Sequence, residues 1–168
     1  GNNWNRILNI DEHTGFNEIH MDPKDSKVLY ATAHQRRRHV YTYVGGGPGS
    51  GIYKSTDAGN SWKKINKGLP SVEIGRIGMD ISPVDNNVLY AIVEAADRKG
   101  GFYKSVDMGE SWTKQSGKVT SGNYYQEIFA DPVELGTVYL MDTWMSVTKD
   151  GGKTFKNVGE DFKHVDNH

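Results

Sequence analysis

Short runs of alternating apolar and polar residues recur along the chain, each bounded by Gly, Pro or Asp. In "GIYKS" (residues 51–55) and "GFYKS" (residues 101–105), apolar and polar side chains alternate. This period of two is typical of a half-buried β-strand and favours strands over helices. The sequence therefore predicts an all-β protein built from many short strands.

The predicted strands fall into a repeated unit. A Pro stands third in "MDPKDSKVLYA" (21–31), "ISPVDNNVLYA" (81–91) and "ADPVELGTVYL" (130–140), at the turn between a first and a second strand. In the middle unit we expect strands at 76–81, 88–94, 101–105 and 111–115. Four short strands in each of several consecutive units is the pattern of β-propeller blades.

A polar turn recurs between the third and fourth strands: "STDAGNSW", "SVDMGESW" and "TKDGGKTF". We expect the Asp to accept hydrogen bonds from the turn's own N–H groups and the Gly to supply positive φ. The Ser or Thr would close the turn, and the aromatic residue would pack between adjacent sheets. Because every unit carries it, we interpret the turn as structural rather than catalytic. Its residues are Ser55, Asp57, Gly59, Trp62, Ser105, Asp107, Gly109, Trp112, Thr148, Asp150, Gly152 and Phe155.

The turn pattern Ser/Thr-x-Asp-x-Gly-x-Ser/Thr-Trp/Phe resembles the Asp-box, or BNR repeat. Asp-box β-propellers include sialidases, xyloglucan-degrading enzymes and sortilin-type receptor domains. The chain looks most like bacterial exported proteins described as sortilin-like or glycosyl-hydrolase-like. The resemblance implies a ring of about seven blades and an extracellular or periplasmic location. It specifies fold better than function, because enzymes and binding proteins share the box.

The repeats predict three complete blades, at about residues 16–66, 73–116 and 124–159. Residues 1–7 are expected to form the last strand of a preceding blade, and residues 160–168 to lead into a further one. Three blades cannot close a ring and would leave two unpaired sheet edges. We therefore expect a propeller segment, completed by the remaining blades or by other chains.

The composition of the chain argues against several classes of partner and functional site. The net charge of the 168-residue chain is −1, so no overall field draws it to nucleic acid or to an acidic membrane. It has no cysteine, which excludes disulfides, thiol nucleophiles and cysteine-ligated metals. No apolar run approaches the ~20 residues that a membrane-spanning helix needs. We expect no nucleic-acid partner, no membrane insertion and no cofactor.

The candidate ligand face comprises the loops that join second to third strands and those that join blades, opposite the polar turns. In the first unit this loop is long, "HQRRRHVYTY" (34–43) followed by "GGGPGSG" (45–51), and long loops are often functional. The guanidinium of arginine forms bidentate hydrogen bonds with carboxylates, and aromatic rings stack on sugars and cations. The candidate ligand-binding residues are Arg36, Arg37, Arg38, Tyr41, Tyr43 and Tyr125. The alternative is that the arginines pair with neighbouring acids and join adjacent blades.

Other motifs give weaker signals. The glycine run lacks the Lys-Ser/Thr of a phosphate-binding loop. An inverting glycosidase needs two carboxylates roughly 6.5–9.5 Å apart. Four loop acids could supply such a pair, but none matches a family catalytic motif, so no catalytic residue is assigned: Asp11, Glu12, Glu94 and Asp97. The histidines show no metal signature, whether beside the arginines or in the tail: His34, His39, His164 and His168.

The function most consistent with these features is a non-catalytic binding module that recognises a peptide, protein or glycan on its loop face. One alternative is a glycoside hydrolase whose catalytic acids lie partly outside this segment. Another is a scaffold piece of a larger complex.

Overall fold

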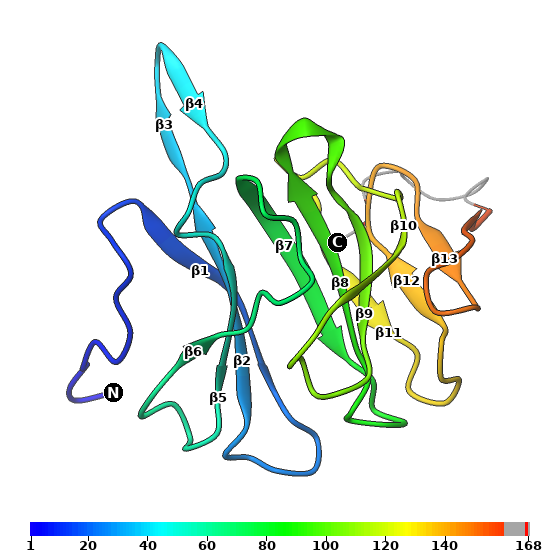
Figure 1. Cartoon of the computed structure of the whole chain (residues 1–168), viewed down its shortest axis with the longest axis horizontal. Coiled ribbons are helices and arrows are strands. Elements are labelled where there is room, and N and C mark those ends of the chain that lie inside the picture. Colours follow the sequence, from blue (N-terminus) through cyan, green and yellow to red (C-terminus); the bar gives the residue numbers. More distant parts are fainter. Residues whose placement is uncertain (160–166, 168) are drawn as a thin grey trace.

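The computed structural model of the chain describes residues 1–159 and residue 167. This part consists of β-strands joined by turns, with one short 3-10 turn at Ala96–Arg98. Its strands form three four-stranded antiparallel sheets that lie side by side, and a two-stranded ribbon that projects beyond the first sheet (Figure 1). No helix in the described part is long and apolar enough to cross a membrane. The predicted all-β class is confirmed.

In each sheet the four strands lie side by side in chain order, and only the β3–β4 ribbon interrupts the order, between β2 and β5. The first sheet contains β1 (Thr14–Met21), β2 (Leu29–Gln35), β5 (Gly51–Ser55) and β6 (Lys63–Lys64). The second contains β7 (Ile74–Ile81), β8 (Leu89–Ala95), β9 (Gly101–Ser105) and β10 (Thr113–Ser116). The third contains β11 (Ile128–Ala130), β12 (Val138–Leu140), β13 (Ser146–Thr148) and β14 (Lys156–Asn157). The ribbon pairs β3 (Arg37–His39) with β4 (Thr42–Val44).

The apolar cores lie between the sheets. One cluster joins Tyr30 and Ile52 of the first sheet to Ile77 of the second, and all three are fully buried. Another joins Phe102 of the second sheet to Leu140 of the third. Alternate side chains of each strand point to opposite faces, so the middle sheet buries one set against each neighbour. Each large apolar side chain buried in this way contributes about 1.5–3 kcal/mol.

The first strands of successive sheets are joined by acidic side chains. Glu18 Oε2 accepts a hydrogen bond from Met79 N at 2.9 Å, and Asp80 Oδ2 accepts one from Ala130 N at 2.8 Å. These carboxylates satisfy strand N–H groups that have no neighbouring strand on that side. Burial raises the pKa of Asp80 above its ordinary value, against the hydrogen bonds that it accepts.

The three polar turns have one hydrogen-bond pattern. In the second, Ser105 Oγ donates to Asp107 Oδ1 at 2.7 Å, and the N–H groups of Gly109 and Ser111 donate to Ser105 Oγ and Asp107 Oδ1, both at 2.9 Å. Equivalent bonds form around Asp57 and Asp150. The turn glycines have positive φ, as the turn requires: 88° at Gly59, 84° at Gly109 and 98° at Gly152.

The N-terminal segment forms no strand in the structure. The strand expected within residues 1–7 is not formed, because no described strand lies beside this segment to pair with it. Its assignment to a preceding blade stays a prediction. Of the tail expected to lead into a further blade, residues 160–166 and 168 lie outside the described residues, and with them His164 and His168.

Candidate functional site

The β3–β4 ribbon presents the candidate arginines. The sequence predicts a long loop here, whereas the structure has a hairpin in which Arg38 lies opposite Tyr43 and only Val40 and Tyr41 form the connection. The alternation of side chains along an extended chain puts Arg36 and Arg38 on one face and Arg37 on the other.

Arg36 and Arg38 border a cavity of about 150 Å³ between the ribbon and the loop that precedes β11. Its other lining residues are Tyr43, Asn123 and Tyr124. The Arg36 guanidinium carbon lies 5.6 Å from the centre of the Tyr43 ring, a cation–π distance. Arg36 also borders a second cavity, of about 280 Å³, beside His13 and Phe16. Two arginines and two tyrosines therefore line one small cavity.

Among the described residues, these arginines have no acidic partner. No carboxylate in the described part of the chain lies within ion-pair distance of Arg36, Arg37 or Arg38. The alternative in which they join adjacent blades through neighbouring acids thus finds no support there. Arg76 on β7 has that role instead, because its guanidinium lies 3.7 Å from Glu127 and donates to the Tyr124 carbonyl at 3.4 Å.

The other face of the ribbon carries Arg37, His39 and Tyr41, which contact one another. Arg37 Nε donates to His39 Nε2 at 2.9 Å, and the His39 ring stacks on Tyr41 with centres 5.5 Å apart and planes 7° apart. Tyr41 is 85% exposed at the tip. The structure therefore separates Arg37 and Tyr41 from Arg36, Arg38 and Tyr43.

The loop between the second and third sheets supplies Tyr124 to the cavity, whereas the sequence-based choice was its neighbour Tyr125. Both N–H groups donate to the Ser121 carbonyl, at 3.0 and 2.8 Å, so the chain turns tightly here. Gln126 anchors the loop: its side chain is fully buried and donates to the carbonyls of Arg76 and Ile92. Tyr125 is half-buried and does not line the cavity.

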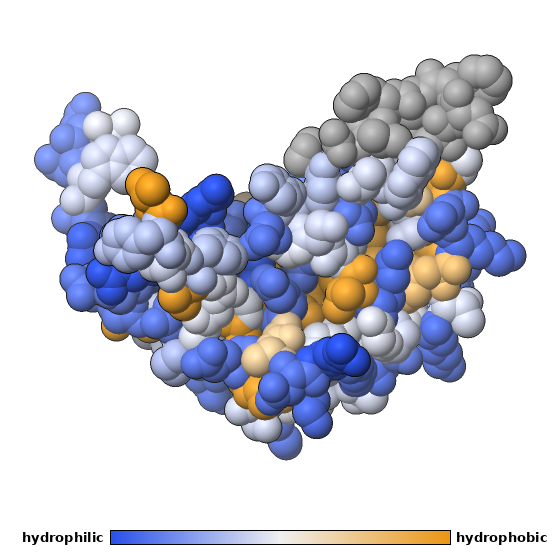
Figure 2. Space-filling view, turned by 90° about the horizontal axis from the view of Figure 1, so that it is seen from above, coloured by the Kyte–Doolittle hydropathy of each residue, from blue (hydrophilic) through white to orange (hydrophobic). Residues whose placement is uncertain are grey.

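Buried His34 lies at the base of the ribbon. Its Nε2 is 3.4 Å from the Gly45 carbonyl, and burial lowers the pKa of the imidazole below its ordinary value. The glycine run that follows is structural: Gly47 N donates to the Ile74 carbonyl at 3.0 Å, and Gly49 N to Gln35 Oε1 at 2.8 Å. Seen from above the view of Figure 1, the molecule is mostly hydrophilic, with several apolar patches (Figure 2).

Two of the loop acids, Asp11 and Glu94, accept local hydrogen bonds. Asp11 accepts bonds from Thr14 Oγ1 and His13 N, which lower the pKa of its carboxyl. Glu94 accepts the Arg76 N–H at 3.1 Å, and a cavity of about 290 Å³ beside it is lined by Arg98 and Thr120 with no second acid. The described residues contain no group of three His, Asp or Glu that could hold a metal ion.

Solved structures of low sequence identity share the arrangement of the three sheets. A GH74 enzyme from Niastella koreensis aligns with 88% of the chain at a TM-score of 0.61 and 21% identity. A GH74 xyloglucanase from Xanthomonas campestris aligns with 88% at 0.60 and 16%. YCF48 bound to D1 peptide aligns with 89% at 0.61 and 14%.

The chain is a β-propeller segment of three four-stranded blades. It spans only 23% of each GH74 chain and 41% of the YCF48 chain. Sequence identities of 14–21% support a shared fold and do not assign a function. No family model and no curated protein matches the sequence.

Proposed function

We propose that this chain is part of a larger Asp-box propeller that binds a carboxylate-bearing peptide, without catalysis, at the cavity between the ribbon and the Tyr124 loop. The observation that carries the proposal is the pair Arg36 and Arg38, which line one cavity and have no acidic partner among the described residues. The N–H groups of a guanidinium can donate two parallel hydrogen bonds to the two oxygens of a carboxylate. Two arginines without an acidic partner therefore suit an anionic ligand.

A peptide fits the site better than a glycan. The ribbon has only two strands in the described part of the chain, so its edges are open to an added strand. An extended peptide can pair with such an edge through its main chain while its carboxylate meets the arginines. A structure with this fold, YCF48, holds a D1 peptide. From the family resemblance we also propose an extracellular or periplasmic location.

The test is a library of fluorescein-labelled peptides with free carboxyl termini, each compared with its C-terminal amide by fluorescence anisotropy. We expect Arg36→Ala with Arg38→Ala to weaken binding of the carboxylate form about tenfold or more, since a charged hydrogen bond contributes about 1.5–3 kcal/mol. The melting temperature should stay constant because both side chains are exposed.

Arg37→Ala is the matched control, because Arg37 is adjacent in sequence but turned to the other face of the ribbon. Equal losses for Arg37→Ala, or equal binding of acid and amide peptides, would contradict the proposal.

A glycoside hydrolase is the second candidate, supported by the structural likeness to two GH74 enzymes. Against it, the cavity beside Glu94 has one carboxylate where hydrolysis needs two. Release of reducing sugar from xyloglucan by this chain, abolished by Glu94→Gln, would favour the enzyme over the binding module.

A further inference from the structure

The second and third blades meet at a cavity of about 320 Å³ beside their polar turns. The second blade contributes Lys104 of β9 and Thr113 of β10 to its lining, and the polar turn of the third blade contributes Asp150 and Lys153. None of the lining residues belongs to the ribbon or to the Tyr124 loop. The cavity is therefore separate from the proposed peptide site.

The boundary between the first and second blades has a glutamate at the corresponding place. The polar turns "SVDMGESW" and "TKDGGKTF" align Glu110 with Lys153. The third strands "GIYKS" and "GFYKS" align Lys54 with Lys104. At the first boundary, Glu110 lies 3.4 Å from the ammonium groups of both Lys54 and Lys63. The glutamate carboxylate therefore bridges two lysines of the preceding blade.

The second boundary has no such bridge. A lysine stands in place of the glutamate, and no acidic side chain of the described residues lies within ion-pair distance of Lys104 or Lys153. Lys54 also donates to the Met108 carbonyl at 2.8 Å. The Lys104 ammonium, in contrast, donates to no described residue and lies 6.0 Å from the centre of the Tyr90 ring.

Lys104 nevertheless reaches the polar turn of the third blade. A methyl group added at Gly151, the counterpart of Met108, would lie 3.6 Å from Lys104 Nζ. Lys104 is half-buried, and Lys153 of the neighbouring blade is exposed. Two lysines, one from each blade, therefore line one cavity without the carboxylate that joins the corresponding groups at the first boundary.

The acid in the lining of the cavity does not replace that carboxylate. Asp150 Oδ1 accepts hydrogen bonds from Thr148 Oγ1 and Thr154 N, and Oδ2 accepts one from Thr154 Oγ1. Asp107 accepts the equivalent bonds at the first boundary, where Glu110 binds the lysines as well. The turn aspartate thus leaves room for a second carboxylate at this position.

We propose that the cavity between the second and third blades binds a carboxylate, held between the ammonium groups of Lys104 and Lys153 in the position that Glu110 takes at the first boundary. Hydrogen bonds between an ammonium and a carboxylate are shorter and stronger than neutral ones. The ammonium groups of Lys63 and Lys54 lower the pKa of Glu110, as expected if this position favours a negative charge.

The ligand class follows from the glutamate at the first boundary. Its carboxylate is carried on a short aliphatic side chain, so the proposed ligand is a short aliphatic carboxylic acid. A free organic acid and an acidic side chain of a partner protein carry the same group. The Thr113 hydroxyl, at the position of Lys63, is available as a further donor.

The test is a titration of the isotope-labelled chain with glutarate at constant ionic strength, followed by amide NMR. We expect saturable shifts of the Lys104, Gly151 and Lys153 amide signals. The signals of Lys54 and Met108 should stay unchanged, because Glu110 already occupies their site. The same titration with N-acetylglutamate methylamide represents a protein side chain: its binding supports a partner's acidic residue as the source, whereas binding of glutarate alone supports a free acid. No saturable shift with either probe would overturn the proposal.

Lys153→Glu supplies the carboxylate from the chain itself. We expect it to weaken glutarate binding about tenfold or more, because the added carboxylate competes for Lys104. Lys67→Glu is the matched control, since it changes the net charge equally at an exposed residue outside the cavity. Equal weakening by the two substitutions would overturn the proposal, because the effect would then be one of overall charge.

Glu110→Gln makes the opposite change at the first boundary. It removes the bridging carboxylate and leaves Lys54 and Lys63 in place, so the amide signals of Lys54 and Met108 should then respond to glutarate. No response in this variant would contradict the correspondence between the two boundaries on which the proposal rests.

Discussion

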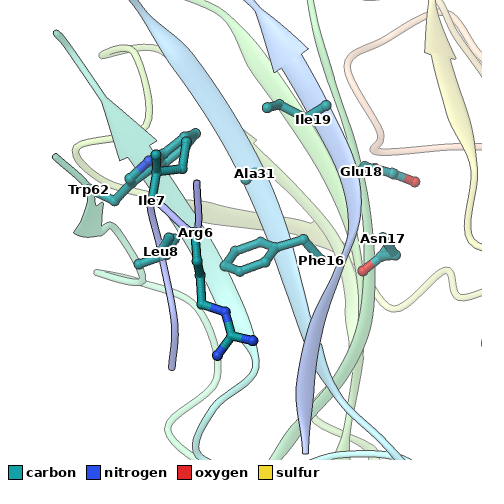
Figure 3. A pocket seen from close by; sticks show the side chains of 9 residues that line it. All are labelled: Arg6, Ile7, Leu8, Phe16, Asn17, Glu18, Ile19, Ala31 and Trp62. Carbon is teal, nitrogen blue, oxygen red and sulfur yellow. The ribbon is translucent and has the colours of Figure 1, made fainter. Parts of the chain in front are cut away.

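Trp62 and Trp112 occupy the same position in successive polar turns but have different surroundings. Trp112 is 3% exposed, and its backbone and indole N–H groups donate to the carbonyls of Lys67 and Ile65 in the preceding blade. Trp62 is half-buried, and its indole donates to Gly59 within its own turn. Trp112 thus connects two blades, whereas the contacts of Trp62 with described residues are with its own blade and the N-terminal segment (Figure 3).

The polar part of the turn is the same in both blades. The hydroxyl of Ser55 or Ser105 lies within 2.8 or 2.7 Å of the neighbouring Asp, whether or not a blade covers the aromatic residue. The carboxylate geometry is therefore a local property of the turn sequence, as expected for side chains that bond to their own backbone. The contribution of the tryptophan, in contrast, depends on the neighbouring blade.

Trp112→Ala should be the most damaging of the changes that test this comparison. It removes a buried aromatic side chain and leaves a cavity between the first two blades, which costs about 3–5 kcal/mol. Urea unfolding followed by circular dichroism gives the change in the free energy of unfolding. A loss below that of Trp62→Ala would mean that the blade boundary is not where Trp112 contributes.

Asp107→Ala tests the local part of the turn and should destabilise by about 1–2 kcal/mol, because water can replace part of the lost hydrogen bonding. Desolvation raises the pKa of Asp107, but hydrogen bonds from Ser111 and Ser105 outweigh it and lower the pKa to about 2. A carboxyl with a lowered pKa contributes stability above its ordinary value of 3.8, and this is lost as the pH falls through about 2.

Unfolding by urea at a series of pH values measures this dependence, with Asp107→Asn as the comparison. The native protein should lose stability between about pH 4 and pH 2 more steeply than the variant. Parallel curves for the two proteins would show that the turn carboxylate does not contribute.

The sequence predicts the repeated parts of the molecule well, because strand alternation and turn chemistry are local. The third strand of the second blade, residues 101–105, is predicted without error. The placement of the candidate site residues is harder to predict from the sequence. Which face of the ribbon each arginine occupies depends on the Arg38–Tyr43 register, and the choice between Tyr124 and Tyr125 depends on the tight turn at Ser121. Both are set by pairing and packing that no short motif encodes.

Trp62→Ala should have the smallest effect in this chain, at most about 1 kcal/mol, since it removes a half-buried ring and one hydrogen bond within the turn. Urea unfolding of this variant beside Trp112→Ala measures the difference between an aromatic residue that a neighbouring blade covers and one that no described blade covers. Equal losses for the two substitutions would mean that the position of the aromatic residue in the turn, rather than the neighbouring blade, determines its contribution.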